Sequence, residues 1–297
     1  MSGVVVEGPD GSGKTSLVRE LRNRLHYPVI HVVQPKRPNV TQMLQLLDCG
    51  PAIFDRFQWS PIAYGDALRD GPELSSYDLW ALDGYLMSRG YVLLFCVTDV
   101  LTMLENNRKA PQLWEAVKNY APLSKLVARY SRLYETSELR RFVFDYQKTE
   151  TEEVISYVNA FAREAAPEHV LGHPRPKIWF VGDERADKGS KGVHVPFYDE
   201  GISDKLLSGT LLHRALTDAG LTWGRGVALS NSANVDLRAV YSALGEPERV
   251  VALGAAANGR LHKAGIDGRV VAHPQWWRRF KYSDPDGYTE LLKEATR

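Results

Sequence analysis

The chain has 297 residues, of which 44% are hydrophobic and 25% charged, a composition typical of soluble globular proteins. Its 37 lysines and arginines balance 36 aspartates and glutamates, so any nucleic-acid binding must come from a local patch. No apolar run is long enough to cross a bilayer, and the N-terminus does not have the pattern of a signal peptide, so we expect no membrane partner.

The first half of the chain alternates short apolar strands with segments of helical periodicity. We expect strands at residues 4–7, 29–33, 52–55, 92–97 and 142–145. We expect helices at residues 14–25, 40–47, 77–88, 100–108, 114–134 and 151–165. This alternation predicts an α/β fold in which helices cover both faces of a parallel sheet.

A second set of strands and helices follows a stretch rich in proline. Residues 166–176 contain three prolines and a glycine and are predicted to be a linker between a domain at 1–165 and a domain at 177–297. In the second domain we expect strands at 178–182, 227–230, 250–253 and 269–272. Helices are expected at 206–219, 237–244, 255–263 and 288–295, which is enough for a second α/β domain with its own core.

A glycine-rich motif joins the first strand to the first helix and fits G-x-x-x-x-G-K-[ST] with no mismatch. We expect its backbone to cradle nucleotide phosphates, Lys14 to reach the β- and γ-phosphates, and Thr15 to offer a hydroxyl to Mg²⁺. The alternative is a turn that binds nothing. The predicted nucleotide-binding residues are Gly8, Asp10, Gly11, Ser12, Gly13, Lys14, Thr15 and Ser16.

An Asp-Arg pair, Asp55-Arg56, leaves the carboxyl end of the third predicted strand, where α/β sheets bind ligands. The aspartate can orient or deprotonate an acceptor hydroxyl or hold the Mg²⁺ shell, and the arginine can bind an anionic oxygen through two hydrogen bonds. The alternative is a structural ion pair. The chain has no N-K-x-D motif, which weakens a GTPase interpretation.

Glu7 with the glycine-rich motif, and the segment from Asp55 to Tyr64, resemble the thymidylate kinase family and its deoxynucleoside kinase relatives over about residues 1–165. The resemblance implies a five-stranded parallel sheet, ATP with Mg²⁺ as the donor, and a nucleotide-like acceptor. It implies that Arg56 contacts the acceptor and that Asp10 or Asp55 lies near the accepting oxygen.

The same resemblance implies an arginine-bearing lid over the phosphates. Arg108 stands where the lid should begin, although the sequence there departs from the family pattern. Phe57, Trp59 and Tyr64 are candidates for contact with the acceptor. For Phe57 and Trp59, a position in the core is an equal alternative.

Three segments of the second half resemble the uracil-DNA glycosylase superfamily: Gly182-Asp183 with Pro196-Phe197, Asn231 after a strand, and His273-Pro274 after the strand–helix that starts at Val251. The resemblance implies that Phe197 stacks on a flipped base, Asn231 binds its Watson–Crick edge, and His273 lies near the base or sugar. The loop after Gly182 lacks the family's proline. We therefore hypothesise that this domain binds a base without releasing it.

An aromatic-basic cluster, residues 276–281, comes directly after His273-Pro274. Trp276 and Arg278 are its candidates for DNA contact, because stacking rings beside cations are typical of nucleic-acid surfaces. The alternative is that the tryptophans are core residues and the cations a solvated face.

The two halves together resemble the 5-hydroxymethyluracil DNA kinases of phages. The resemblance implies an ATP-dependent kinase that phosphorylates the hydroxymethyl group of that base in DNA, with Lys14, a lid arginine, and Asp55 or Asp10 in the reaction. One alternative is a deoxynucleoside monophosphate kinase acting on free dTMP or a modified dUMP. Another is a DNA-binding module switched by ATP. Cys49 and Cys96 have no metal-ligand spacing, which favours a reducing cytoplasm, that of the host if the protein is viral.

Overall fold

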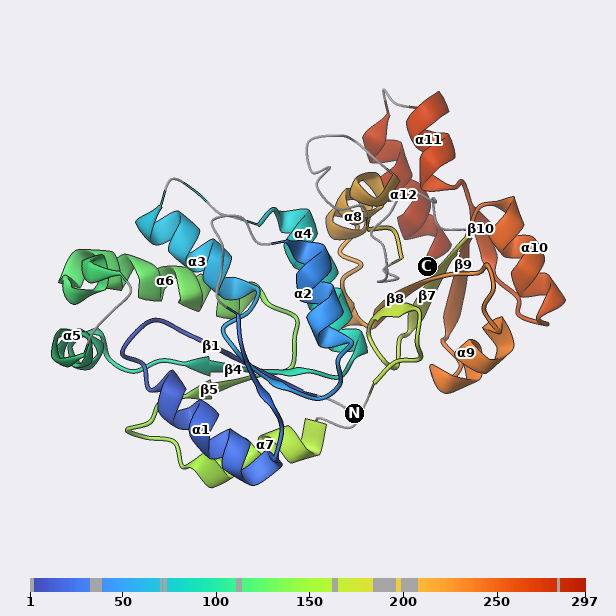
Figure 1. Ribbon diagram of the computed structural model, residues 1–297. Helices are drawn as coiled ribbons and strands as arrows, with labels where there is room; N and C mark the ends of the chain where they lie inside the picture. Colours follow the sequence, from blue (N-terminus) through green and yellow to red (C-terminus); the bar gives the residue numbers. More distant parts are fainter. Residues whose placement is uncertain are drawn as a thin grey trace. The chain divides into compact units, whose positions relative to one another are not determined.

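The computed structural model describes residues 3–32, 39–69, 71, 74–110, 114–161, 165–183, 196–198, 208–281 and 284–297 (Figure 1). The chain divides into two compact units. Unit 1 comprises Met1–Ser75 and Arg89–Glu164, and unit 2 comprises Ser76–Ser88 and Ala165–Arg297. Each unit contains a five-stranded sheet with helices packed on it, so the prediction of two α/β parts is confirmed.

The sheet of unit 1 is parallel throughout and has the strand order β2-β3-β1-β4-β5. Its central strands β1 and β4 are buried along their whole length, as expected of parallel strands covered on both faces. The expectation of five parallel strands is therefore confirmed. The strands are β1 (Val4–Glu7), β2 (Val29–His31), β3 (Ile53–Asp55), β4 (Val92–Cys96) and β5 (Arg141–Phe144).

Helices cover both faces of this sheet (Figure 1). On one face, α1 and α7 bury apolar side chains such as Leu17, Leu21 and Val158 against the strands. On the other face aromatic rings fill the core, and Trp59 packs edge-on against Phe95 with ring centroids 6.2 Å apart. The helical segments are α1 (Lys14–Leu25), α2 (Val40–Leu47), α3 (Trp59–Leu68), α5 (Val100–Lys109), the 3₁₀ segment η1 (Glu115–Lys118), α6 (Tyr120–Thr136) and α7 (Thr151–Phe161).

Two helical segments of unit 1 differ from the prediction. Helix α3 was not predicted, because every residue from Trp59 to Gly65 is buried and the segment lacks the polar face that produces a 3.6-residue period. The helix expected at 114–134 is interrupted at Asn119, which is extended (φ −111°, ψ 142°) and separates η1 from α6. Pro122 then lies in the first turn of α6, where a missing N–H costs nothing.

The sheet of unit 2 has the order β10-β9-β7-β8-β6. Strands β7 to β10 are parallel, and β6 pairs antiparallel with β8 at one edge. The four expected strands of this half are therefore present. The bounds are β6 (Val170–Gly172), β7 (Ile178–Gly182), β8 (Val227–Asn231), β9 (Arg249–Leu253) and β10 (Arg269–Val271).

The predicted linker at 166–176 is wrong over its middle part, because it contains β6. Val170 and Leu171 are 2% and 0% exposed, and Val170 lies opposite Ser230 in the ladder. The prolines flank this three-residue edge strand, which is where sheets tolerate proline. They bound a strand of unit 2 and do not mark a free connection.

Helix α4 (Ser76–Ser88) was expected in the first domain but belongs to unit 2. Trp80 stacks on Trp223 with ring centroids 4.8 Å apart, and the Trp223 indole N–H donates to the Trp80 carbonyl oxygen at 3.1 Å. A Cβ on Gly84 would lie 2.8 Å from the Trp223 ring. The partner that assigns α4 to unit 2 is therefore far away in sequence, so local periodicity carries no sign of it.

The remaining helices of unit 2 cover its sheet on both faces (Figure 1). Leu237, Val240 and Leu261 from α9 and α10 form one core with the strands. The other face is covered by α8, α11 and α12, with α4 beside β6. The bounds are α8 (Ser208–Asp218), η2 (Trp223–Arg225), α9 (Leu237–Ala243), α10 (Ala255–Lys263), α11 (Pro274–Phe280) and α12 (Pro285–Ala295).

Cys49 and Cys96 are free thiols, the first exposed and the second buried. Within the described ranges, no helix combines the length and the apolar character that a bilayer span requires.

Candidate functional site

The glycine-rich loop of unit 1 (residues 8–13) joins the end of β1 to the start of α1. Gly13 has φ 87°, a left-handed conformation that glycine adopts without a Cβ clash. Gly8 has φ 146°, and a Cβ there would lie 2.2 Å from the carbonyl oxygen of Cys96. The hydroxyl of Ser12 donates to the carbonyl oxygen of Pro9 at 2.8 Å and closes the loop on itself. The path of the loop therefore requires glycine at both positions.

Lys14 opens α1 and is only 6% exposed. Its Nζ donates to the carbonyl oxygen of Pro9 at 2.5 Å. Burial and the neighbouring Arg56 guanidinium lower the pKa of Lys14 to about 8, while the carboxylates of Asp10 and Asp55 act in the opposite direction. Lys14 is thus a poorly solvated amine that an anionic ligand would stabilise in its charged form.

Arg56, Asp10 and Tyr64 form a cluster beside the glycine-rich loop. The Arg56 guanidinium pairs with one carboxylate oxygen of Asp10 and donates to the Gly8 carbonyl oxygen at 3.2 Å. The Tyr64 hydroxyl donates to the other Asp10 oxygen at 2.8 Å. Burial raises the pKa of Asp10, but Arg56, Lys14 and Tyr64 together bring it below its ordinary value. Asp10 is therefore held as a carboxylate with both oxygens engaged.

Glu7 ends β1, is fully buried, and was not among the predicted site residues. Its Oε1 accepts the backbone N–H groups of Phe57, Trp59 and Ser60 at 2.8, 2.9 and 3.2 Å. Its Oε2 accepts the Ser60 hydroxyl at 2.6 Å and lies 3.4 Å from the Tyr130 hydroxyl. Glu7 therefore anchors the turn after β3 to the start of the glycine-rich loop and satisfies the first donors of α3. The sequence did hold a signal for this role: Glu7 ends a strand of buried residues, and a buried charge needs hydrogen-bond partners.

Phe57 and Trp59, two predicted acceptor contacts, are both 0% exposed. The Phe57 ring lies 4.8 Å from that of Phe54, inside the core. No base can stack on rings enclosed in this way, so both residues take the alternative role of core side chains. Tyr64 is also buried, but its hydroxyl bond to Asp10 places it at the site.

Asp55 ends β3 with its side chain 15% exposed, and its Oδ2 lies 2.9 Å from Nδ1 of His31. His31 ends β2 and stands opposite Asp55 in the register of the sheet. His31 was not predicted as a site residue. Its position follows from strand pairing, which the sequence of one strand does not reveal.

Helix α5 contacts the loop through two asparagines. The side-chain amides of Asn106 and Asn107 donate to the carbonyl oxygens of Gly11 and Asp10 at 2.9 and 3.2 Å. The next residue, the predicted lid residue Arg108, is exposed, and its Nε donates to a carbonyl oxygen of η1 at 3.3 Å. In the described contacts, the asparagines and not the arginine reach the glycine-rich loop.

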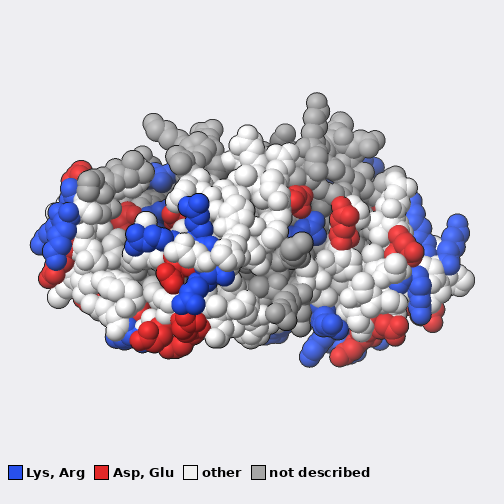
Figure 2. All heavy atoms as spheres, turned by 60° about the horizontal axis from the view of Figure 1, so that its bottom comes forward, with Lys and Arg blue, Asp and Glu red and all other residues white. Residues whose placement is uncertain are grey.

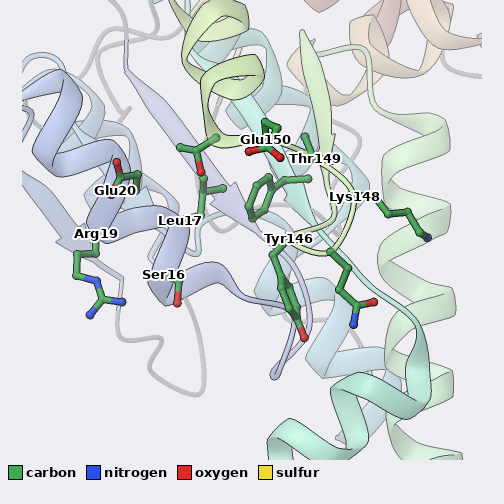
Figure 3. Close-up of a pocket in the computed structure, with 11 residues that line it drawn as sticks. Ser16, Leu17, Arg19, Glu20, Tyr146, Lys148, Thr149 and Glu150 are labelled. Carbon is green, nitrogen blue, oxygen red and sulfur yellow. The ribbon is translucent and has the colours of Figure 1, made fainter.

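A cavity of about 410 Å³ opens between α1 and the loop from β5 to α7 (Figure 3). Tyr146 marks its boundary with the glycine-rich loop, since a Cβ on Gly13 would lie 2.8 Å from the Tyr146 ring. The Asn106 amide donates to the Tyr146 hydroxyl at 3.0 Å. Ser16 and Leu17 line the α1 side, and the exposed Thr15 precedes them. The opposite wall is formed by Phe144, Gln147, Lys148, Thr149 and Glu150.

The three predicted base contacts of unit 2 lie together at the carboxyl ends of its strands. The ring centroids of Phe197 and His273 are 6.2 Å apart. A Cβ on Gly182 would lie 2.3 Å from the Phe197 ring and 2.9 Å from Oδ1 of Asn231. Asn231 is only 5% exposed. Burial lowers the pKa of His273, against the opposing effect of Asp183, so the imidazole favours its neutral form.

Asp183, next to Gly182, is paired with an arginine. The Arg260 guanidinium binds the Asp183 carboxylate and also donates to the Ser232 hydroxyl at 3.0 Å. The Asp183 carbonyl oxygen accepts the backbone N–H and the hydroxyl of Ser232, both at 3.1 Å. Asp183 is therefore fixed between β7, β8 and α10. Residues 184–195, which include the segment without the family's proline, lie outside the described residues.

The cluster at residues 276–281 lies on α11 and just beyond it. Trp276 and Phe280 are 46% and 67% exposed, with ring centroids 5.4 Å apart. Trp277 instead packs on Tyr288, and Arg278 is partly buried. Trp276 and Phe280 therefore form an exposed aromatic pair, while Trp277 takes the alternative role of a packing residue.

On the face drawn in Figure 2, basic and acidic side chains are interspersed and neither sign covers the face alone. Among the described residues, no three histidine, cysteine, aspartate or glutamate side chains are grouped as a metal site.

No family model matches this chain, and no curated protein matches it. Some solved structures resemble about half of it. The YorR protein of Bacillus subtilis, in complex with phosphorylated GDP, is 18% identical over 54% of this chain and 94% of its own, with a TM-score of 0.46. Deoxyadenosine kinase from M. mycoides with bound dATP is 15% identical over 54% of this chain and 100% of its own, with a TM-score of 0.38. A gluconokinase from Sinorhizobium meliloti is 16% identical over 54% of this chain and 91% of its own, with a TM-score of 0.35.

Proposed function

We propose that the chain is an ATP-dependent phosphotransferase whose glycine-rich loop holds the phosphates of the donor. The observation that carries this proposal is the position of Lys14, a buried amine at the N-terminus of α1 within a loop bent by Gly8 and Gly13. Thr15 is exposed in the first turn of α1, where its hydroxyl suits Mg²⁺ carried by the nucleotide. Bound Mg²⁺ neutralises charge on the phosphate oxygens.

The cavity beside Tyr146 is the proposed site of the adenine ring. Its volume of about 410 Å³ falls in the range of small-molecule sites, and it begins where the glycine-rich loop ends. Tyr146 and Leu17 offer apolar contact to a planar ring, and Ser16 and Thr149 offer polar atoms for its edge. The triphosphate would then run from this cavity along the loop to Lys14.

The acceptor lies on the side of Arg56 in this proposal. A guanidinium has five N–H donors, and Asp10, Gly8 and Tyr130 engage only part of that set. In this proposal the guanidinium also donates to an anionic oxygen of the acceptor. Asp10 keeps Arg56 in place, so we assign Asp10 to positioning and Asp55 to the accepting hydroxyl.

We propose the hydroxymethyl group of 5-hydroxymethyluracil in DNA as the acceptor. A phosphoryl acceptor needs a nucleophilic hydroxyl, which thymine lacks. Support comes from unit 2, where Phe197, Asn231 and His273 converge as a base-binding site requires. The exposed rings of Trp276 and Phe280, with cations beside them, supply stacking and phosphate contacts for DNA.

The pairing of Asp183 supports binding of a base without its release. Glycosylase chemistry needs a group that activates water, and Asp183 is the described candidate. Arg260 binds its carboxylate, so that oxygen is already engaged. A reducing cytoplasm suits the two free thiols, Cys49 and Cys96.

The second candidate is a kinase of free dTMP or a modified dUMP, which the cavity and the Arg56 cluster of unit 1 favour by themselves. It predicts activity without DNA. A nucleotide-switched DNA-binding module, the third, predicts nucleotide-dependent DNA affinity and no phosphorylated product.

These candidates are separated by transfer of label from γ-labelled ATP to DNA containing 5-hydroxymethyluracil, to unmodified DNA, and to free dTMP or hydroxymethyl-dUMP. Lys14→Ala serves as the blank. Label in the modified DNA alone supports the proposed acceptor. Label in the free nucleotides alone rules it out in favour of the monophosphate kinase, and no label with any acceptor rules out both kinases.

A further inference from the structure

His31 and Asp55 form a carboxylate–imidazole pair at the carboxyl edge of the unit 1 sheet. They are the last residues of the neighbouring strands β2 and β3, in register with each other, and Nδ1 of His31 lies 2.9 Å from Oδ2 of Asp55. The His31 side chain is 65% exposed and that of Asp55 only 15%. The Asp55 carboxylate oxygen accepts a hydrogen bond, which favours the tautomer of His31 with its proton on Nδ1. Nε2 is then left as a base that solvent and ligands can reach.

This pair lies on the acceptor side of the glycine-rich loop. Asp55 is next to Val6 in the register of β3 with β1, and the loop begins two residues after Val6. The carboxylate of Asp55 also acts on the buried amine of Lys14. Strands β2 and β3 lie on the same flank of β1, and His31 ends β2 at the carboxyl edge of the sheet, the edge at which parallel sheets bind ligands.

The two described carboxylates beside the start of the glycine-rich loop, Asp10 and Glu7, are already occupied. Both oxygens of Asp10 are bound, one by Arg56 and one by Tyr64. Glu7 is fully buried and accepts three backbone N–H groups and the hydroxyl of Ser60. A general base must reach the proton that it removes, and neither carboxylate is placed to do so.

Stability does not account for the His31–Asp55 pair. Even with the imidazole charged, a pair with one partner as exposed as His31 contributes about 0–1 kcal/mol to folding. A carboxylate that orients an imidazole is instead a common arrangement for proton transfer, because it fixes the ring and stabilises the imidazolium that forms.

We propose that His31 is the general base for the acceptor hydroxyl and that Asp55 is its positioning residue. This inference rests on the proposed phosphotransferase function and gives Asp55 a more specific role. As the acceptor oxygen bonds to the γ-phosphorus of ATP, the bond from that phosphorus to the β,γ-bridging oxygen breaks and ADP leaves with the electron pair. The hydroxyl proton passes to Nε2 of His31, and the imidazolium then returns it to solvent.

The test is chemical rescue of transfer to the acceptor that the parent protein labels. We expect His31→Ala to lower kcat by about 100-fold with the KM for ATP within twofold of the parent. Imidazole added to the assay should raise kcat of the His31→Ala variant at least tenfold, since the emptied site is open to solvent. His262→Ala, at another exposed histidine, is the matched control and should keep the parent rate.

Asp55→Asn tests the positioning role. It should lower kcat by about tenfold, and the double variant His31→Ala/Asp55→Asn should be no slower than His31→Ala alone, because the two residues act as one unit. Multiplicative losses would show that Asp55 acts separately, for instance on Mg²⁺, and would overturn its assigned role.

A His31→Ala rate within tenfold of the parent, or a larger loss that imidazole does not restore, overturns the proposal for His31 while leaving the kinase intact. If the parent protein labels no acceptor at all, the proposed function itself is wrong and the base assignment falls with it.

Discussion

Neutralising Glu7 should destabilise unit 1 strongly, although Gln has the same size. The carboxylate is 0% exposed and binds four close donors: the amides of Phe57, Trp59 and Ser60 and the Ser60 hydroxyl, at 2.6–3.2 Å. Hydrogen bonds to a charged partner contribute about 1.5–3 kcal/mol each, against about 0.5–1.5 kcal/mol for neutral pairs, so replacing the charge at all four bonds would cost about 4–6 kcal/mol if nothing compensated. The new amide can donate to the hydroxyls of Ser60 and Tyr130, so we expect Glu7→Gln to cost about 2–3 kcal/mol.

The assay is thermal unfolding of the full chain combined with amide hydrogen exchange. For a unit of this size the loss corresponds to a fall of about 4–12 °C in the transition that belongs to unit 1. The exchange rates of the amides of Phe57, Trp59 and Ser60 should increase more than those of the later amides of α3. Glu105→Gln is the control, because that carboxylate is 68% exposed and its described ion pair is with Lys109 on the same helix. One kcal/mol corresponds to about 2–4 °C for a unit of this size. A transition temperature of Glu7→Gln within about 1 °C of that of the control would therefore refute this reasoning.

Three further predictions concern the two sites. Gly13→Ala should weaken ATP binding at least tenfold by equilibrium titration, because φ is 87° and the new Cβ lies 2.8 Å from the Tyr146 ring; an unchanged affinity would contradict the loop geometry. Binding of ATP at pH ~9 should take up nearly one proton, because phosphates raise the pKa of Lys14 from about 8 in the free protein. Calorimetry in two buffers of different ionisation enthalpy measures this uptake, which Lys14→Met should abolish; equal uptake in the variant would assign the proton elsewhere. Gly182→Ala should reduce affinity for DNA containing 5-hydroxymethyluracil at least tenfold without changing ATP binding, since its Cβ would lie 2.3 Å from the Phe197 ring. Unchanged DNA affinity would place the base elsewhere.

The glycine-rich loop of unit 1 could be predicted because its signals are local. The motif ending in Lys14 and Thr15 lies in one continuous stretch, and its structure follows from glycine stereochemistry and from the strand and helix on either side. The same holds for most strands, whose apolar runs are bounded by polar turns. Local sequence therefore predicted most of the strands and the bend of the glycine-rich loop.

The surroundings of Arg56 and Asp55 were predicted less completely because their contacts join residues far apart in the sequence. Glu7 binds amides about 50 positions later, and His31 meets Asp55 only through strand pairing. Phe57 carries no mark that distinguishes a core ring from a stacking ring, since both are aromatic residues after a strand. Burial, which decides between the two, is a property of the assembled unit.

Unit 2 shows the same division. The positions of Phe197, Asn231 and His273 at one edge followed from an ordered set of short motifs. The assignment of α4 to this unit did not, because it depends on the packing of Trp80 against Trp223. The strand within the expected linker was missed because three residues between prolines are too few for a periodic pattern.

The central claim, that one chain phosphorylates a base within DNA, is tested most directly by nucleoside mass analysis. A DNA oligonucleotide with a single 5-hydroxymethyluracil is incubated with the protein, ATP and Mg²⁺. The DNA is then digested to nucleosides under conditions that leave a phosphate on the hydroxymethyl group in place. The account predicts that the hydroxymethyl nucleoside gains one phosphate, and that Lys14→Ala and Gly182→Ala each prevent this gain. An unchanged nucleoside, under conditions in which the protein phosphorylates free dTMP or hydroxymethyl-dUMP, would contradict the account.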